Sequence, residues 1–279
     1  ATTEQGIGFS YKVTAEAMDT LIYQQVMEAF NNKAFYQLPG KDKIISIAKY
    51  FLGTHYVAST LETGEEEQLV VNLRGMDCTT YVEYVLAILS CLELERTAMD
   101  DFYLALANIR YRDGRIDGYL SRLHYFTEWL QENRRWGRLE LVSDEFGNAD
   151  FDANVGFMST NSNFYRQLTE EPGLLFPLRA IEARVSQFKM RYITKNRIDE
   201  LAHYIQDGDI IAFTSSIAGL DVSHTGFALN HNGRLHLLHA STRTHQVEIT
   251  PVALSDYLAG MSRVTGILVA RWIYDGERD

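Results

Sequence analysis

Cysteine and proline are scarce in this sequence of 279 residues, which contains only two cysteines and four prolines. Positive charge is also low, because 26 lysines and arginines stand against 37 aspartates and glutamates. Proteins that bind the phosphate backbone of nucleic acids normally show the opposite balance or a basic stripe. No apolar run approaches the roughly 20 residues that a transmembrane helix needs. We therefore expect neither nucleic-acid binding nor a membrane-spanning segment.

The remaining composition is ordinary for a globular protein, with 46% hydrophobic and 23% charged residues. A chain of this length is large enough for one large domain or two small ones. It begins at Ala1 without an initiator methionine, either because the sequence is trimmed or because an export signal has been removed. We expect the second case, and with it an exported, periplasmic protein.

The two cysteines, Cys78 and Cys91, are thirteen positions apart, and the apolar spacing between them predicts a helix. A helix of that length separates the two residues by about 20 Å at 1.5 Å per residue. A disulfide needs Cα atoms within roughly 7 Å of each other. We therefore expect both thiols to be free, which makes the position of Cys78 informative.

Cys78 lies where a glycine-containing loop gives way to this amphipathic helix. Asp77 can serve as the N-cap, while the spacing of Thr80 and Glu83 fits a capping box. Either choice places Cys78 within a residue or two of the helix start, beside unpaired backbone N–H groups and a partial positive charge. Such a position is expected to lower the pKa of a thiol and favour the nucleophilic thiolate.

Apolar spacing divides the rest of the chain into a helical part and a strand-rich part. Helical spacing covers residues 15–31 and 44–52 and most of residues 99–206. Strand-like segments then follow one another, separated by turn residues such as Asn232-Gly233. A helical first half followed by an antiparallel sheet is typical of an α+β fold. The expected strands are residues 209–214, 224–230, 234–240, 246–250 and 265–273.

The Asn232-Gly233 turn fixes which residues of its two strands face each other. A turn centred there pairs His231 with Arg234, and counting outward places Gly226 opposite His239. His224 and His239 then lie on one face as diagonal neighbours, roughly 7–8 Å apart at the backbone. A cysteine hydrolase needs a base and a group that orients the base. His224 and His239 are candidates for these two roles.

Metal binding is the main competing interpretation of these histidines. Neither an HExxH motif nor paired CxxC motifs occur in the sequence. His236 and His239 are three residues apart, which on a strand points their side chains to opposite faces. We therefore expect no metal and no cofactor, and we interpret His236 as structural.

Five stretches together resemble the NlpC/p60 cysteine hydrolases of the papain-like fold, and more closely their N-acetylmuramoyl-L-alanine amidase-like branch. The resemblance covers nearly the whole chain. It implies a single domain over residues 1–279 with a helical insertion at about 99–206. The stretches that carry it are residues 53–62, 72–80, 118–126, 222–227 and 237–241.

The resemblance also implies an activity: a bacterial cell-wall amidase that cuts the amide between N-acetylmuramic acid and L-alanine in muropeptides. By position, Cys78 matches the family's nucleophile, His224 its base and His239 its third residue. Tyr56 matches the tyrosine that helps to hold the oxyanion. Asp77 matches an acidic residue that contacts the peptide near the scissile bond.

Several further residues are candidates for substrate binding. Arg122 and His124 could recognise carboxylate or sugar groups, because a guanidinium matches a carboxylate well. A solvated helix with a structural ion pair explains this segment equally well. Glu62, Tyr119 and Ser223 are weaker candidates of the same kind. Two other functions stay open: a D-γ-glutamyl-diamino acid endopeptidase, and a wall-binding module without catalytic activity.

Overall fold

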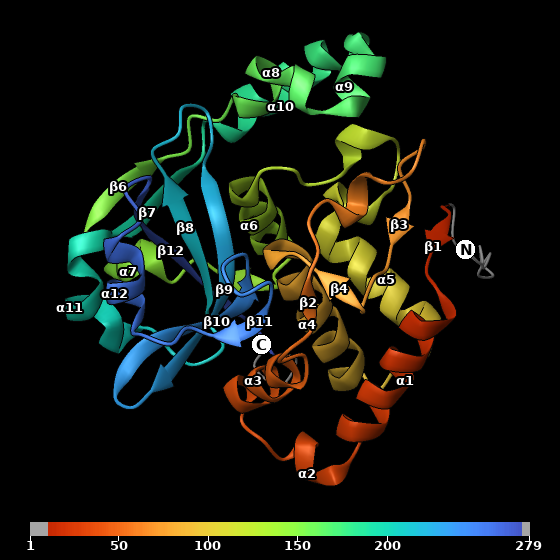
Figure 1. The fold of residues 1–279 in the computed structure, drawn as a ribbon, viewed down its shortest axis with the longest axis vertical. Helices are drawn as coiled ribbons and strands as arrows, with labels where there is room; N and C mark the ends of the chain where they lie inside the picture. Colours follow the sequence, from red (N-terminus) through yellow and green to blue (C-terminus); the bar gives the residue numbers. More distant parts are fainter. Residues whose placement is uncertain (1–10, 275–279) are drawn as a thin grey trace.

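A ten-stranded, mostly antiparallel sheet lies beside a group of helices from the N-terminal half (Figure 1). The computed structural model describes residues 11–274. The strands follow one another in the sheet in the order β4-β2-β11-β10-β9-β8-β12-β7-β6, with β5 paired to β12. Only β2 and β4 run parallel to each other within this sheet. The strands are β2 (His55–Tyr56), β4 (Gly75–Met76), β5 (Leu139–Glu140), β6 (Ala149–Asp152), β7 (Lys189–Thr194), β8 (Ile210–Ser215), β9 (Val222–His231), β10 (Arg234–Ser241), β11 (Gln246–Ile249) and β12 (Val264–Trp272).

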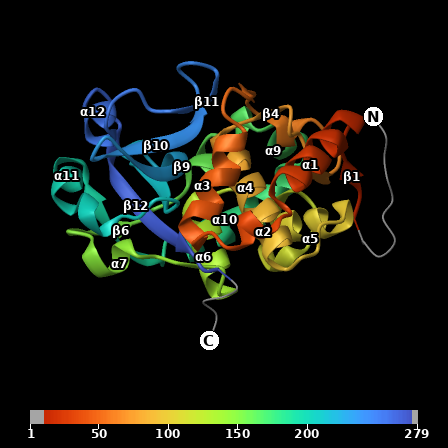
Figure 2. The same ribbon diagram turned by 90° about the horizontal axis from the view of Figure 1, so that it is seen from below.

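The helices of the N-terminal half pack around α4 (Figure 2). A small parallel pair, β1 (Val13–Thr14) and β3 (Leu69–Val70), lies outside the large sheet. Among residues 11–274, no helix is long and apolar enough to cross a membrane. The α-helices are α1 (Ala17–Phe30), α2 (Lys33–Tyr36), α3 (Gly40–Tyr50), α4 (Cys78–Glu93), α5 (Met99–Arg110), α6 (Phe126–Arg135), α7 (Ser143–Phe146), α8 (Phe157–Thr160), α9 (Arg166–Glu170), α10 (Leu175–Val185), α11 (Ile198–Leu201) and α12 (Leu254–Ala259).

Helix α4 is buried on almost every side: from Thr80 to Leu92 all of its residues except Ser90 are buried, and most of them are apolar or aromatic. A helix that is hydrophobic all round is found inside a protein, not on its surface. One side contacts β9 and β10, and others contact α3 and α5. The Tyr81 hydroxyl donates a hydrogen bond to the Ala48 carbonyl of α3 over 2.8 Å. The first residue of this helix, Cys78, is therefore held in a fixed place beside the sheet.

The hairpin between β9 and β10 has the predicted register. Asn232 and Gly233 both have positive φ values, 51° and 76°, as a tight two-residue turn requires. His231 pairs with Arg234, and Leu238 pairs with Phe227. His239 is the next residue along β10 and therefore lies opposite Gly226. The predicted strands of the C-terminal half are likewise confirmed, each within two residues of its expected ends.

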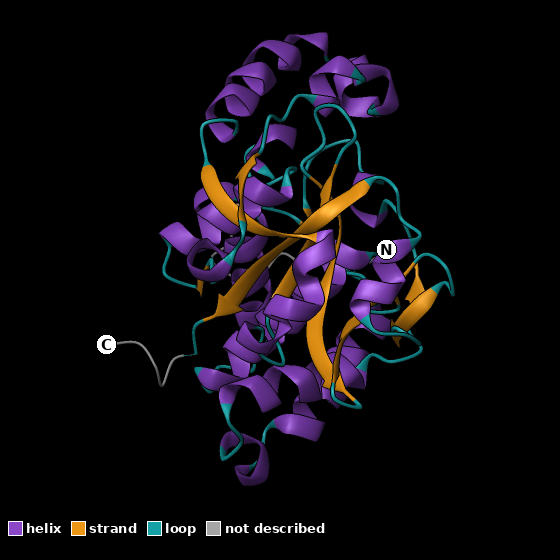
Figure 3. Ribbon diagram, turned by 90° about the vertical axis from the view of Figure 1, so that its left-hand side faces the viewer, coloured by secondary structure: helices purple, strands orange, loops and turns teal. Residues whose placement is uncertain are grey.

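The segment from 99 to 206 differs from the expected helical insertion, because it contains β5, β6 and β7. Strands β6 and β7 form one edge of the large sheet, and ion pairs such as Arg191–Asp150 and Lys189–Asp152 cross between them. Edge strands often carry charges that prevent pairing with further strands. The charged residues of these two strands interrupt the apolar alternation by which strands are recognised in a sequence. Helices α8, α9 and α10 lie together at the end of the molecule, beyond the twisted strands (Figure 3).

The close approach of the two strands at Gly226 gives a first prediction. A Cβ atom at this residue would lie 2.8 Å from the His239 Cβ and 2.8 Å from the Leu238 carbonyl oxygen. We expect Gly226→Ala to lower the free energy of unfolding by roughly 1–3 kcal/mol, as overpacking does in other cores. Urea denaturation would measure the change. Gly260→Ala is the control, since no atom lies within 4 Å of its Cβ; equal stability of the two variants would contradict the prediction.

Candidate active site

The start of α4 is fixed by a reciprocal pair of hydrogen bonds around Cys78. The Thr80 backbone N–H donates to the Asp77 carboxylate over 2.8 Å, and the Asp77 backbone N–H donates to the Thr80 hydroxyl over 2.9 Å. Asp77 is thus the N-cap, and Cys78 is the first residue of the helix. The backbone N–H of a first helical residue has no partner within its helix. This N–H is available to a ligand atom beside the thiol.

His224 and His239 are in direct contact. The His224 Nε2 and His239 Nδ1 atoms lie 2.6 Å apart, and the two rings are almost perpendicular. His224 is half-buried, whereas His239 is fully buried behind it. Glycine at position 226 allows β9 to approach β10 closely at His239. His236 has a structural position instead, with its Nδ1 2.8 Å from the Thr250 carbonyl oxygen.

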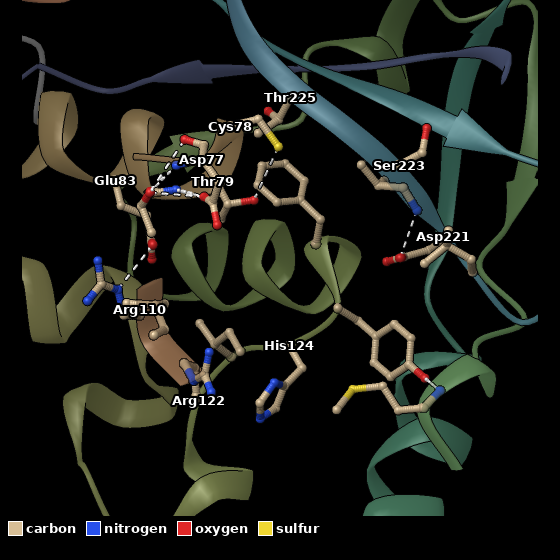
Figure 4. A pocket seen from close by; sticks show the side chains of 18 of the residues that line it. Asp77, Cys78, Thr79, Glu83, Arg110, Arg122, His124, Asp221, Ser223 and Thr225 are labelled. Carbon is tan, nitrogen blue, oxygen red and sulfur yellow. Dashed lines mark hydrogen bonds and ion pairs between the residues drawn. The ribbon is translucent and has the colours of Figure 1, made fainter. Parts of the chain in front are cut away.

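Cys78 and His224 line the same pocket, which has a volume of about 290 Å³. Figure 4 shows the Cys78 sulfur at the start of α4, with Ser223 on the facing strand β9. The Thr225 backbone is close enough to the Cys78 thiol to lower its pKa, and Thr225, the residue that follows His224, lines the same pocket. The other expected site residues in the lining are Glu62, Asp77, Tyr119, Arg122 and His124. Across residues 11–274, no three His, Cys, Asp or Glu side chains are grouped so that they could hold a metal ion.

Burial controls the protonation of the cysteine and its neighbours. Burial, followed by the nearby Asp77 carboxylate, raises the pKa of the Cys78 thiol to about 12. Burial lowers the pKa of His224 to about 4. The expectation of a lowered thiol pKa at the helix start is therefore wrong, because desolvation outweighs the opposing hydrogen bonds from Thr225 and Thr79. At neutral pH the site holds a neutral thiol and a neutral imidazole.

Tyr56 reaches the site through a short parallel strand pair. It lies opposite Met76, two residues before Cys78. Burial, followed by the charges of Cys78 and Asp77, raises the pKa of the Tyr56 phenol to about 12. The phenol therefore keeps its proton at neutral pH and can donate a hydrogen bond. Tyr56 is half-buried and is not among the residues that line the pocket itself.

Arg122 is already paired with carboxylates. Its Nη2 atom lies 2.7 Å from Glu62 Oε1 and its Nε atom lies 2.9 Å from Glu67 Oε1. The guanidinium also lies over the Tyr119 ring, 5.3 Å from its centroid. The structural ion pair, which was the alternative to substrate recognition for this segment, is therefore present. Arg122 still lines the pocket, but two carboxylates neutralise its charge.

His124 is bonded within the same wall of the pocket. Its Nε2 atom lies 2.7 Å from the Tyr119 carbonyl oxygen. Burial, followed by the charge of Arg122, lowers the pKa of His124 to about 3. His124 is thus neutral and donates from Nε2, which leaves Nδ1 as an acceptor. The imidazole of His124 can therefore accept a hydrogen bond at Nδ1, while its Nε2 proton is already used by the Tyr119 carbonyl.

Other parts of the pocket come from residues that the sequence did not indicate as site residues. Glu83 and Arg110 form a buried ion pair in its lining, with 3.1 Å between Oε1 and Nε. Asp221 accepts hydrogen bonds from both the backbone and the hydroxyl of Thr127. These contacts join residues that are far apart in the chain, so local spacing could not reveal them. The apolar part of the lining includes Tyr125, Phe126, Phe157, Met158 and Tyr165.

Comparison with known families gives one match that covers most of the chain. A family model described as N-acetylmuramoyl-L-alanine amidase-like matches residues 46–267. No curated protein sequence matches the chain.

Solved structures show the same fold. The crystal structure of an N-acetylmuramoyl-L-alanine amidase from Bacteroides uniformis is 37% identical, covers 84% of this chain and 98% of its own, and superposes with a TM-score of 0.80. A Bacteroides fragilis protein named as a candidate xylanase is 38% identical, with coverages of 81% and 99% and a TM-score of 0.78. Protein LPG0564 from Legionella pneumophila is 22% identical, with coverages of 92% and 96% and a TM-score of 0.68, and shows likeness of fold alone.

The raised thiol pKa predicts how Cys78 reacts with iodoacetamide. Because the pKa is about 12, the thiolate fraction should grow roughly tenfold per pH unit below that value. We expect the alkylation rate of Cys78 to rise steadily between about pH 6 and 9. Mass spectrometry measures the rate. Cys78→Ala is the control for alkylation of Cys91, because burial also raises the pKa of the Cys91 thiol to about 12. A rate that is constant over this range would instead indicate a thiolate–imidazolium pair at rest.

Proposed function

Because the chain belongs to the N-acetylmuramoyl-L-alanine amidase-like family, we propose that it hydrolyses the amide between N-acetylmuramic acid and L-alanine in muropeptides. One observation carries this proposal. A free cysteine at a helix start shares a pocket with a histidine whose second ring nitrogen is bonded to another histidine. This arrangement supplies a nucleophile, a base and a group that orients the base, as acyl transfer requires.

The first chemical step is general-base activation of the thiol. His224 Nε2 is occupied by His239, so Nδ1 is the atom left to take the Cys78 proton. The sulfur then attacks the lactyl carbonyl carbon of the muramic acid. In this proposal the Cys78 N–H and the Tyr56 hydroxyl stabilise the oxyanion, a contribution of about 2.7–4 kcal/mol for a well-placed donor.

The second half of the reaction returns the enzyme to its starting state. The tetrahedral intermediate breaks its C–N bond, and the His224 imidazolium gives its proton to the L-alanine nitrogen, which leaves as an amine. Water then attacks the thioester carbon while His224 Nδ1 accepts a water proton. The C–S bond breaks, the lactyl carboxyl group is released, and the proton returns to Cys78.

The name of the Bacteroides fragilis protein suggests glycoside hydrolysis as another activity. The carboxylates of the pocket favour acyl transfer instead. A glycosidase uses two carboxyl groups on either side of the bond, one of them as a proton donor. Here Glu62 is paired with Arg122, and Glu83 is paired with Arg110. The other two pocket carboxylates, Asp77 and Asp221, accept hydrogen bonds from Thr80 and Thr127. All four carboxylates are therefore held by partners within the protein, which does not favour their use as an acid and base on either side of a glycosidic bond.

Two alternatives use the same pocket differently. An endopeptidase would cut the D-γ-glutamyl bond to the diamino acid and leave the muramyl amide intact. A wall-binding module would bind muropeptides without converting them. The masses of the products from one defined muropeptide distinguish all three, since only the amidase releases a stem peptide that begins with L-alanine.

The proposal predicts the effect of removing the thiol. We expect Cys78→Ala to reduce the release of L-alanine-initiated peptide by at least about 10³-fold, because the covalent route is lost. Cys91→Ala, which removes the other buried thiol, should keep most of the activity. Liquid chromatography with mass spectrometry measures the products, and xylan serves as an additional substrate. Unchanged turnover in Cys78→Ala would rule out the thiol mechanism, and sugar release from xylan would rule out the proposed specificity.

A further inference from the structure

A carboxylate lies directly behind the two histidines. Strands β10 and β11 pair so that His239 faces Glu248. The His239 Nε2 atom lies 3.9 Å from Glu248 Oε1, and the Glu248 side chain is only 17% exposed. His239 itself is fully buried, and its Nε2 atom has no hydrogen-bond partner in the described structure. A buried polar nitrogen without a partner is costly, so its nearest charged neighbour matters.

The positions of the ring protons on His224 and His239 follow from the proposed role of His224 as the base. If Nδ1 of His224 is to accept the thiol proton, Nε2 must carry the ring proton and donate it to His239 Nδ1. A neutral His239 that accepts at Nδ1 must carry its own proton at Nε2. That proton is directed toward the side of the ring where Glu248 lies. The carboxylate therefore favours the tautomer of His239 on which the basicity of His224 depends.

We propose that Glu248 is a positioning residue, which holds His239 as the Nε2–H tautomer and stabilises the imidazolium that forms on His224. This inference rests on the proposed thiol mechanism, and adds Glu248 as a fourth side chain to Cys78, His224 and His239. At rest, 3.9 Å is longer than a hydrogen bond. The contact acts through charge at that distance, and hydrogen bonds of this kind often tighten only when substrate is bound.

The other groups around His239 oppose a full proton transfer to it. Arg243, from the turn before β11, lies over the Tyr257 ring of α12, 4.4 Å from its centroid. Tyr257 in turn packs edge-on against His239, with 5.6 Å between ring centroids. Burial, followed by the charges of His224 and Arg243, lowers the pKa of His239 to about 3. His239 therefore stays neutral and transmits the influence of Glu248 without taking up a second proton.

Kinetics on a defined muropeptide test the role of the charge. Glu248→Gln keeps the shape and removes the charge, so we expect kcat to fall about tenfold, with KM unchanged, as for partners of other functional histidines. The acid limb of the pH profile of kcat/KM should move to lower pH, because loss of the carboxylate makes His224 less basic. The control is Glu145→Gln, which removes one exposed carboxylate that is remote from the site. An unchanged kcat and acid limb in Glu248→Gln would overturn the proposal.

Nuclear magnetic resonance of ¹⁵N-labelled histidine tests the tautomer without substrate. We expect His239 in the wild type to be protonated at Nε2, and Glu248→Leu to shift it toward the Nδ1–H form. The wild-type pattern in Glu248→Leu would overturn the role of Glu248 as the tautomer-fixing group. This readout does not depend on the substrate. If the wild type fails to cleave muropeptides while Glu248→Leu shifts the tautomer, the proposed function is contradicted and the tautomer-fixing role of Glu248 is supported.

Discussion

The packing of Tyr81 against Phe227 determines where the reactive groups meet. Tyr81 lies three residues after Cys78 on α4, and Phe227 lies three residues after His224 on β9. Both side chains are fully buried, and their rings meet edge to face with 5.7 Å between centroids. Edge-to-face pairs of this kind add about 0.5–1.5 kcal/mol beyond the burial of their area. This contact joins the helix to the strand and so brings the thiol and the imidazole into one pocket.

The burial that fixes this geometry also decides the chemistry. A thiolate–imidazolium pair would place two charges where burial disfavours them, because burial raises the thiol pKa and lowers that of His224. The resting site is therefore neutral, and charge appears only during reaction. In the proposed mechanism the donors and dipoles for that moment are the start of α4, the Tyr56 phenol, and the bonded pair of His224 and His239. Groups that are oriented in advance need no reorganisation when charge develops.

The sequence predicted the parts of the site that depend on local rules. The Asn232-Gly233 turn gave the register of the hairpin, and with it the contact between His224 and His239. Helical spacing placed Cys78 at the start of α4 and excluded a disulfide with Cys91.

The features that the sequence did not reveal depend on tertiary contacts. The raised pKa of Cys78 comes from burial against β9, which no local pattern reports. The Arg110–Glu83 pair joins residues of two helices, and the charged strands β6 and β7 lack a clear apolar alternation. The position of Glu248 beside His239 also depends on a tertiary contact, because the pairing of β10 with β11 brings the two residues together.

In the proposed mechanism, catalysis and recognition depend on different parts of the chain. The reactive side chains come from α4, β9 and β10, which form the buried centre, whereas Phe157 and Tyr165 enter the pocket from the segment around α8. This segment is attached to the body through Tyr125, whose hydroxyl donates to Glu182 and accepts from the Met158 backbone N–H. Because its attachment does not involve Cys78 or His224, this wall can change in sequence without disturbing the reactive groups. If the proposed function holds, this wall would set the preference for sugar or peptide, while the residues of α4, β9 and β10 would carry out the chemistry.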